Sequence, residues 1–332
     1  MTKLGVYLDL RNPPAWRRDW NQLYGFTLEL CEEAERLGAD SVWLSEHHGF
    51  EDGYLTQPLT FASAIAARTR RIRIGTAVVI APFRDPVQLA EEATIIDIVS
   101  NGRLDLGLGA GYRLPEFELF AEDMSARYRA TDDVVRRLRA LWGEARLTPP
   151  PVQAPLPIWM GYQGPKGARR CGLLGEHLLS VDPSLLAPYR DGLVAGGHDP
   201  ASARMSGFVS VYATHDVERD WPVVGEHLRY QVDSYRRYGV EGTGRPAPRP
   251  MDPERARANR LGHGLMGIVV DSPTVVAQAI AAETAGLPVD TVFAWVSIAG
   301  MPDTMVLEHL TTLCTEVAPL LADPAAATEP SR

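Results

Sequence analysis

Residues 71–111 read RIRIGTAVVIAPFRDPVQLAEEATIIDIVSNGRLDLGLGAG, and they contain the clearest indication of the fold class. Its first part, residues 72–80, is apolar and rich in β-branched side chains, as expected for a strand buried on both faces of a parallel sheet. A helix should follow over residues 86–99, because Pro86 suits the first turn of a helix. Residues 103–109 then form the next strand. The stretch therefore predicts a strand–helix–strand unit of a parallel sheet.

The same alternation of strand and helix continues in both directions from this unit. Further strands are expected at residues 3–10, 40–45, 158–161, 177–181, 205–213 and 290–298. Further helices are expected at residues 23–37, 59–68, 167–174, 185–195, 217–238, 274–285 and 303–321, with a helical stretch that follows residue 109 and runs to about residue 142. Eight strands that alternate with helices predict an α/β fold, a (β/α)8 TIM barrel. An open doubly wound sheet is the alternative.

The length of 332 residues would allow two domains, but barrels of this kind commonly form one unit of about 250 residues or more. We therefore expect a single domain over residues 1–322. Residues 239–264 interrupt the alternation with Gly, Pro and Arg, which predicts a lid insertion before the last strand. Residues 323–332 are expected to be a disordered tail.

The composition excludes several classes of partner. Lys and Arg number 33 against 42 Asp and Glu, a formal net charge of -9, so a nucleic-acid partner is not expected. The chain reaches Asp9 and Arg11 before any apolar run long enough for a signal peptide, and prolines break the uncharged residues 147–165. We expect a cytoplasmic protein with no membrane partner. The three cysteines lie far apart and lack metal-ligand spacing, so no metal site is expected.

Polar residues follow the second predicted strand, where a barrel builds its active site. Glu46, His47 and His48 stand there, and adjacent residues of an extended segment point to opposite sides. The two imidazoles therefore cannot easily bind one metal ion. A histidine at the barrel mouth is an available acid, base or hydrogen-bond donor near neutral pH. The alternative is that both histidines are ordinary polar loop residues.

The fourth predicted strand ends in a run of alternating glycines, Gly107, Gly109 and Gly111. The dinucleotide pattern GxGxxG fails in both frames, because Tyr112 and Leu114 occupy the place of the third glycine. Backbone without side chains at the barrel rim would still let a flat ring system approach. The alternative is tight packing around a turn.

The fifth predicted strand leads into a second glycine-rich turn, residues 161–167, GYQGPKG, before a helix that carries Arg169 and Arg170. Unpaired N–H groups and the positive end of a helix dipole suit a phosphate. The alternative is a plain loop with solvated basic residues. No HExxH, GxSxG, Walker or EF-hand pattern is present, so hydrolase and nucleotide-triphosphatase functions lack their usual support.

Taken together, these stretches resemble the bacterial luciferase-like monooxygenase family over nearly the whole chain. The matching stretches are residues 45–54 (SEHHGFEDGY), 71–111, 157–176 (PIWMGYQGPKGARRCGLLGE) and 316–321 (EVAPLL). The resemblance implies a (β/α)8 barrel that binds reduced FMN, often supplied by a separate flavin reductase, and uses O2 to oxidise an organic substrate. A sister branch uses the deazaflavin coenzyme and transfers hydride without oxygen.

Different stretches of this sequence resemble the two branches. Glu46-His47-His48 is similar to the luciferase branch, where the first histidine lies by the flavin ring. Residues 163–166 look like the phosphate-side loop of deazaflavin-dependent reductases. The resemblance favours FMN. The luciferase α subunit has a reactive Cys and then an Arg where this chain has Gly109 and Ala110, and that Arg helps to hold the flavin phosphate. Other residues must hold the phosphate here, and light emission is not implied.

The predicted function is therefore a reduced-FMN-dependent monooxygenase with His47 as the catalytic residue. The residues expected to bind the cofactor are Ala77, Gly109, Tyr162, Gln163, Gly164, Lys166, Gly167, Arg169 and Arg170. The resemblance also implies a cis peptide at Ala77–Val78 beneath the flavin ring and a homodimer. The substrate is expected to be a small or medium organic molecule, with natural-product tailoring as a hypothesis. The alternatives are a deazaflavin-dependent hydride-transfer oxidoreductase and a non-catalytic flavin-binding barrel.

Overall fold

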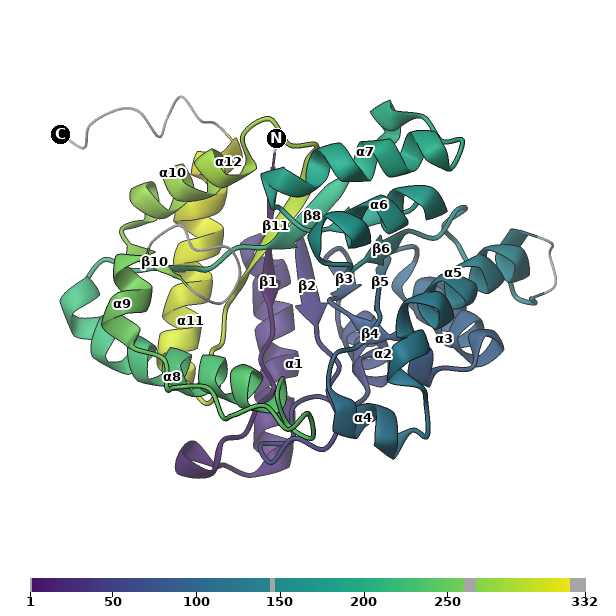
Figure 1. The fold of residues 1–332 in the computed structure, drawn as a ribbon. Helices are drawn as coiled ribbons and strands as arrows, with labels where there is room; N and C mark the ends of the chain where they lie inside the picture. Colours follow the sequence, from purple (N-terminus) through teal and green to yellow (C-terminus); the bar gives the residue numbers. More distant parts are fainter. Residues whose placement is uncertain (1, 144–146, 260–266, 323–332) are drawn as a thin grey trace.

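The computed structural model describes residues 2–143, 147–259 and 267–322, and its centre is a closed barrel of parallel strands. The barrel strands are β1 Lys3–Tyr7, β2 Ser41–Leu44, β3 Arg73–Thr76 with β4 Val79–Ile80, β5 Leu104–Gly109, β6 Ile158–Met160, β7 His177–Leu179, β8 Met205–Phe208 and β11 Val289–Trp295. The sheet order is β3-β2-β1-β11-β8-β7-β6-β5-β4, and pairing of β3 with β5 closes it. With β3 and β4 counted as one interrupted strand, this is the predicted (β/α)8 barrel (Figure 1).

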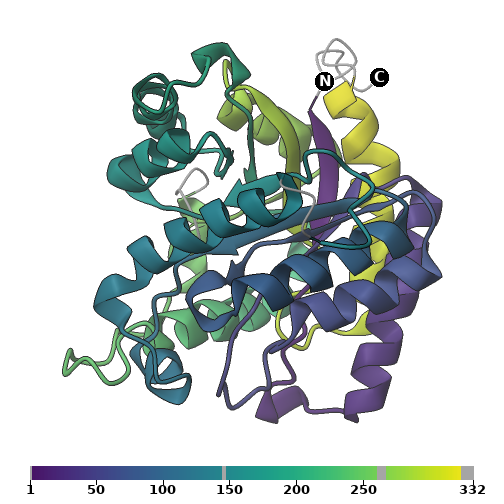
Figure 2. The ribbon, with the colours of Figure 1, turned by 90° about the vertical axis from the view of Figure 1, so that its right-hand side faces the viewer.

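Helices surround the barrel on all sides (Figures 1 and 2). They are α1 Trp20–Leu37, α2 Pro58–Arg68, α3 Pro86–Ser100, α4 Leu114–Leu119, α5 Arg127–Gly143, α6 Gly164–Leu174, α7 Leu186–Ala195, α8 Val217–Tyr238, α9 Pro253–Ala258, α10 Pro273–Thr284, α11 Asp303–Thr312 and α12 Ala318–Ala322. Local chemistry explains their ends. The Asp85 carboxylate accepts from the first N–H groups of α3, and Gly38, at φ 90°, closes α1 in the left-handed conformation.

The third barrel strand is interrupted at the mouth of the barrel. The predicted strand over residues 72–80 lies in the right place, but it divides into β3 and β4 on either side of Ala77 and Val78. The peptide bond between these two residues is cis, as the resemblance implied. Both residues are partly exposed, whereas their strand neighbours Thr76 and Val79 are buried. The interruption therefore presents backbone and two small side chains at the carboxyl end of the barrel.

The seventh predicted strand, residues 205–213, is not continuous, which corrects the sequence prediction. It divides into β8 and β9 Val211–Ala213, and β9 leaves the barrel to pair with β10 Val269–Asp271, a strand that was not predicted. The reason is a second hydrophobic cluster, in which β9 and β10 pack with Val276 of α10 and Leu313. Burial of this cluster outweighs continuation of the barrel strand.

Two predicted helices are divided as well. The stretch up to residue 142 forms α4, a 3-10 turn at Met124–Ala126 and α5, and Ala121 at φ 56° breaks the helical path after α4. The helix expected at residues 303–321 contains a π-helical turn at Leu313–Val317 between α11 and α12. In both cases the sequence located the helical region and missed the break.

The predicted lid, residues 239–264, is described up to residue 259. Residues 245–252 are irregular, and the short helix α9 forms within the stretch. Whether the segment acts as a lid stays a prediction. The Met251 amide donates to the Asp233 carboxylate of α8 at 2.7 Å, which ties the segment to that helix. Residues 260–264 of the predicted lid and the predicted tail, 323–332, lie outside the described residues.

Candidate active site at the carboxyl ends of the strands

His47 lies in the segment that follows β2, after Ser45 and Glu46, and a cage of aromatic side chains surrounds it. The ring centroids of Phe50, Tyr54, Tyr235 and Tyr112 lie 4.7, 4.9, 5.6 and 5.8 Å from that of the imidazole. Only 7% of His47 is exposed. Burial in this cage lowers the pKa of His47 below its usual value, although Glu116 acts in the opposite direction. The imidazole is therefore neutral at pH 7.

The two neighbouring histidines contact different carboxylates. Glu116 of α4 is fully buried, and its Oε1 lies 3.4 Å from Nδ1 of His47. The same oxygen accepts from the backbone N–H of His48 at 2.8 Å. The His48 ring faces the other way, with Nε2 2.8 Å from Oε1 of Glu46. The two imidazoles thus have different neighbours and are directed apart, as predicted. The described residues contain no group of three or more His, Cys, Asp or Glu side chains placed to hold a metal ion.

Glu46 ties the end of β2 to the neighbouring strand. Its carboxylate accepts from the backbone N–H of Ile80 at 2.8 Å and from Nη2 of Arg84 at 2.6 Å, besides contacting His48. Each of these bonds is buried or partly buried, where a charge-assisted hydrogen bond is strong. The loop that carries His47 is therefore held firmly on its outer side.

A chain of hydroxyl groups runs from α8 to the cis peptide. Tyr235 and Tyr54 share a hydrogen bond of 2.8 Å, Tyr54 donates to Ser45 at 2.8 Å, and Ser45 contacts the hydroxyl of Tyr7 at 2.5 Å. Tyr7 in turn donates to the carbonyl oxygen of Ala77 at 2.5 Å. A carbonyl can only accept, so the single proton of each hydroxyl must point towards Ala77. The chain fixes the backbone at the interrupted strand.

Arg11 lies behind the tyrosines, and its side chain is fully buried. Its guanidinium carbon is 4.0 Å from the ring centroid of Tyr54 and 4.2 Å from that of Tyr235. Its Nη1 pairs with Oδ2 of Asp9 at 3.1 Å, and Gln231 of α8 donates to the same oxygen at 2.5 Å. Cation–π contacts and the buried ion pair hold the two tyrosines against β1.

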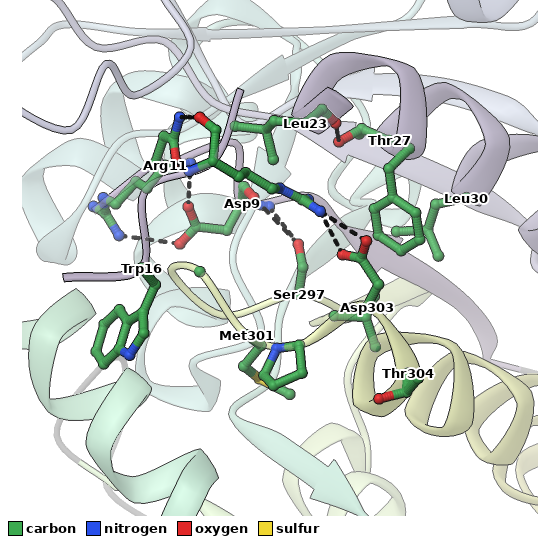
Figure 3. Close-up of a pocket in the computed structure, with 16 residues that line it drawn as sticks. Asp9, Arg11, Trp16, Leu23, Thr27, Leu30, Ser297, Met301, Asp303 and Thr304 are labelled. Atoms are coloured by element: carbon green, nitrogen blue, oxygen red, sulfur yellow. Dashed lines mark hydrogen bonds and ion pairs between the residues drawn. The ribbon is translucent and has the colours of Figure 1, made fainter. Parts of the chain in front are cut away.

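A cavity of about 360 Å³ lies beside Arg11, between α1 and the beginning of α11 (Figure 3). Asp9 and Ser297, which follow β1 and β11, form its polar side. Its apolar walls come from Leu23, Phe26, Leu30, Met301 and Val306. Nη1 of Arg18 binds both carboxylate oxygens of Asp303 at 2.7 Å at its edge. Arg11 thus contacts both this cavity and the tyrosines next to His47.

The glycines at the ends of β5 and β6 make room for Val78. A Cβ atom added to Gly109 would lie 2.4 Å from Cγ2 of Val78, and one added to Gly161 would lie 2.6 Å from its Cγ1. Real Cβ atoms do not approach so closely, so a side chain at either position would force Val78 to shift. Tight packing therefore accounts for Gly109 in this structure. A direct contact between Gly109 and a cofactor stays a prediction. Ala77 and Val78 are partly exposed at the mouth of the barrel, where a cofactor could reach them.

The turn before α6 is open and carries unpaired positive charge. Gly164 has a φ of 68°, and no atom lies within 4 Å of a Cβ added there. Gln163 precedes the helix and makes no side-chain cap. Lys166 and Arg169 are exposed, and neither has an ion-pair partner among the described residues. The helix therefore begins with free N–H groups and two available cations, which suits an anion.

Three other residues predicted at this turn are already engaged. The hydroxyl of Tyr162 donates to Oδ1 of Asp132 on α5 at 2.7 Å, and its side chain is buried. Arg170 pairs with Oδ2 of the same carboxylate at 2.7 Å. Gly167 is buried, and a Cβ there would lie 3.0 Å from Cβ of Tyr162. Tyr162 and Gly167 can face an anion only through backbone, and the charge of Arg170 is compensated.

Residues 4–290 match the sequence profile described as luciferase-like monooxygenase. The chain belongs to this family. A flavin-dependent trigonelline monooxygenase, oxygenase component, from Acinetobacter baylyi is 34% identical over 160 residues, 43% of this chain and 44% of that protein. An F420-dependent glucose-6-phosphate dehydrogenase from Amycolatopsis mediterranei is 27% identical over 61% of this chain and 68% of that protein. This chain thus matches less than half the length of the first relative.

Solved structures show the same family fold. The monooxygenase RslO1 from Streptomyces bottropensis is similar with a TM-score of 0.79 and 26% identity, over 96% of this chain and 99% of that chain. An FMN complex of a type II Baeyer-Villiger monooxygenase from Pseudomonas putida reaches a TM-score of 0.70 at 18% identity, which shows the fold alone. In this luciferase-like chain, no described helix is long and apolar enough to cross a membrane.

Sequence reasoning selected His47 in this family member but missed residues that contact the imidazole or support the residues around it. The missed residues are Tyr7, Arg11, Tyr54, Glu116 and Tyr235. Arg11 and Tyr54 carried a usable signal, because both are polar or aromatic residues in segments that follow barrel strands. Glu116 and Tyr235 lie on helices, and no local pattern indicates that their side chains reach the barrel mouth.

Proposed function

We propose that this luciferase-like protein is a monooxygenase that uses reduced FMN and O2 to oxidise a small or medium organic substrate. The observation that carries the proposal is the pairing of two sites at the same end of the barrel. One is the neutral, caged imidazole of His47, and the other is the open beginning of α6 with Lys166 and Arg169. A relative named as a flavin-dependent monooxygenase and another named as a monooxygenase support the same reaction class.

The described residues fit a flavin nucleotide. The phosphate would lie at the beginning of α6, where Gly164 leaves the backbone N–H groups open and Lys166 and Arg169 supply charge. The ring system would lie over Ala77 and Val78, beside His47. When bound, reduced flavin supplies the two electrons that let one atom of O2 enter the substrate while the other leaves as water.

The chain's own residues contribute orientation and a dry environment. The aromatic cage excludes water from the imidazole of His47, and the hydroxyl chain that ends at Ala77 keeps the floor of the site rigid. A neutral imidazole can accept a proton from a substrate or hold a hydrogen bond to it. His47 is therefore the residue we assign to proton handling and positioning.

A second candidate is hydride transfer with a deazaflavin coenzyme and no oxygen. The F420-dependent dehydrogenase relative, which is matched over 68% of its length, favours it. The open turn at Gly164 would accept the phosphate of either coenzyme. A barrel that binds flavin without turnover is the remaining alternative.

Mass spectrometry with 18O2 separates these candidates. The purified protein is supplied with FMN and a flavin reductase, or with reduced deazaflavin, and offered a panel of phenols, aldehydes, ketones and N-heterocycles. Product that carries one 18O atom, formed only with reduced FMN, is expected. Product formed without oxygen from reduced deazaflavin would support the dehydrogenase instead. Flavin binding without product on any panel member would favour the non-catalytic barrel.

The proposal includes protein partners. A separate flavin reductase is expected, in line with the words "oxygenase component" in the name of the trigonelline relative.

We infer a homodimer from the outer face of α3, where Val87, Ile95, Ile98 and Val99 are 38, 49, 36 and 49% exposed. Sedimentation at micromolar concentration should show a dimer that Ile95→Glu dissociates. A monomeric wild-type protein would refute it.

Natural-product tailoring and a cytoplasmic location complete the proposal. Relatives or similar structures from Streptomyces nodosus and Streptomyces bottropensis are in line with the first. The substrate class itself is left to the panel experiment.

A further inference from the structure

Glu116 is a buried carboxylate that no basic side chain neutralises in the described part of the chain. It is 0% exposed, and the nearby Arg113 directs its guanidinium at Glu241, 2.6 Å away, and at the backbone oxygen of His48. The Oε2 atom of Glu116 has no hydrogen-bond partner among the described residues, and neither has Nδ1 of His47. A buried charge of this kind costs stability, so its retention calls for a functional reason.

The geometry around Glu116 points to that reason. Its Oε1 is fixed by the backbone N–H of His48 at 2.8 Å and lies 3.4 Å from Nδ1 of His47. If Nδ1 carried a lone pair, it would face a carboxylate oxygen and be repelled. With a proton on Nδ1 the same contact is attractive. The carboxylate therefore selects one of the two neutral tautomers of the imidazole.

We propose that Glu116 is a positioning residue that keeps the proton of His47 on Nδ1 and leaves the lone pair on Nε2. The role of His47 in turnover rests on the proposed function, but the tautomer does not. When a substrate O–H or N–H group is deprotonated, its bond to hydrogen breaks, a bond from hydrogen to Nε2 forms, and the electron pair stays on the substrate. Glu116 then stabilises the imidazolium through Nδ1–H.

Glu46 offers a matched control within the same loop. It is also a buried carboxylate beside a histidine, but it contacts Nε2 of His48 instead of His47. Changing Glu46 perturbs the same segment without removing the oxygen that faces Nδ1 of His47. Glu116→Met removes that oxygen at similar volume, and Glu116→Gln keeps an acceptor but removes the charge.

The test is long-range 1H–15N correlation NMR of the 15N-labelled full chain, with the signals of His47 assigned by their loss in His47→Asn. We expect the Nδ1–H tautomer in the wild type and in Glu46→Gln, and a mixed or reversed tautomer in Glu116→Met. In Glu116→Gln the tautomer should persist, while the pKa of His47 falls further because an opposite charge is lost. His47 also has Arg11 and Glu46 within electrostatic reach, and neither is changed in this variant.

Two results would overturn the assignment. One is an Nε2–H tautomer in the wild type. The other is a wild-type tautomer and an unchanged pKa of His47 in folded Glu116→Gln and Glu116→Met. If Glu116→Met does not fold, the wild-type tautomer and the pKa of His47 in Glu116→Gln decide together. Because these readouts need neither flavin nor substrate, failure of the monooxygenase proposal would leave them unaffected, and their failure would leave that proposal standing.

Discussion

The two halves of the candidate site follow strands of the same barrel and are built in opposite ways. Around His47, after β2, the buried side chains of Glu116, Phe50 and Tyr54 contact the imidazole, and the partly exposed Tyr235 and Tyr112 complete the cage. At the beginning of α6, after β6, the Lys166 side chain is exposed and Gly164 faces open space. The first half fixes geometry before any ligand arrives, and the second offers charge and free backbone. Substitutions around His47 should therefore lower turnover, whereas substitutions at the beginning of α6 should weaken cofactor binding.

The largest effect is expected from the buried half. His47→Ala should lower turnover by about 10²-fold or more, because it removes the group that we assign to proton handling. The fold should be nearly intact, as measured by circular dichroism. FMN affinity should change little, since we propose that the phosphate binds at the other half.

His48→Ala is the control, because this ring contacts Glu46 and faces away from the cage. It should keep most of the turnover. Equal losses in the two variants would remove the distinction between the adjacent histidines, and wild-type turnover in His47→Ala would end its assignment.

The next largest effect is expected at the exposed half, the beginning of α6. Replacement of Lys166 and Arg169 by Ala should weaken FMN binding by about 10- to 100-fold, because a charge-assisted contact to a phosphate is worth about 1.5–3 kcal/mol. Riboflavin, which lacks the phosphate, should bind nearly as before. Fluorescence titration of both ligands measures the difference.

Arg170→Ala sharpens this test. Its charge is already compensated by Asp132, so the structure predicts a smaller loss of FMN affinity than for Lys166 or Arg169. If the triple change of all three basic residues weakens FMN and riboflavin equally, the phosphate is bound elsewhere.

Much of the difference between the two halves of the site can be predicted from the sequence, and part of it cannot. The alternation of apolar runs and helical periods located the barrel strands, and the residues after them contained His47 and the turn at Gly164. The partners of these residues come from tertiary packing. Glu116 reaches His47 from α4, and Asp132 reaches Tyr162 from α5, across separations that no local pattern encodes. For the same reason β9 and β10 were missed, because a second hydrophobic cluster determines their pairing.

The pH dependence of turnover should follow the protonation of His47 in the buried half of the site. Burial lowers the pKa of His47 from its ordinary value of about 6.5, so the required neutral form persists at and somewhat below that pH. We expect the acid limb of the kcat/KM profile to lie below pH 6.5. The same shift makes the His47 contribution to stability decline as pH falls below 6.5, because the unfolded chain then binds the proton more readily. An acid limb above pH 6.5 that is absent in His47→Asn would contradict the burial argument.

The smallest effect concerns the predicted lid. Glu241 links residues 239–252 to Arg113 next to the His47 loop, but its side chain is 47% exposed, so the pair should contribute less than about 1 kcal/mol. Glu241→Gln should speed limited proteolysis of this segment several-fold and leave the FMN affinity unchanged. Flavin with substrate should slow cleavage of the wild type. Equal cleavage with and without ligands would show that the segment does not close over the mouth.

We propose that one FMN molecule spans both halves of the site, and a crystal structure of the protein with FMN tests this most directly. The phosphate should lie at the first N–H groups of α6, within reach of Lys166 or Arg169, and the ring system should lie over Ala77 and Val78 with its edge at His47. Phosphate density at another helix, or a ring system placed away from His47, would show that the site is assigned wrongly.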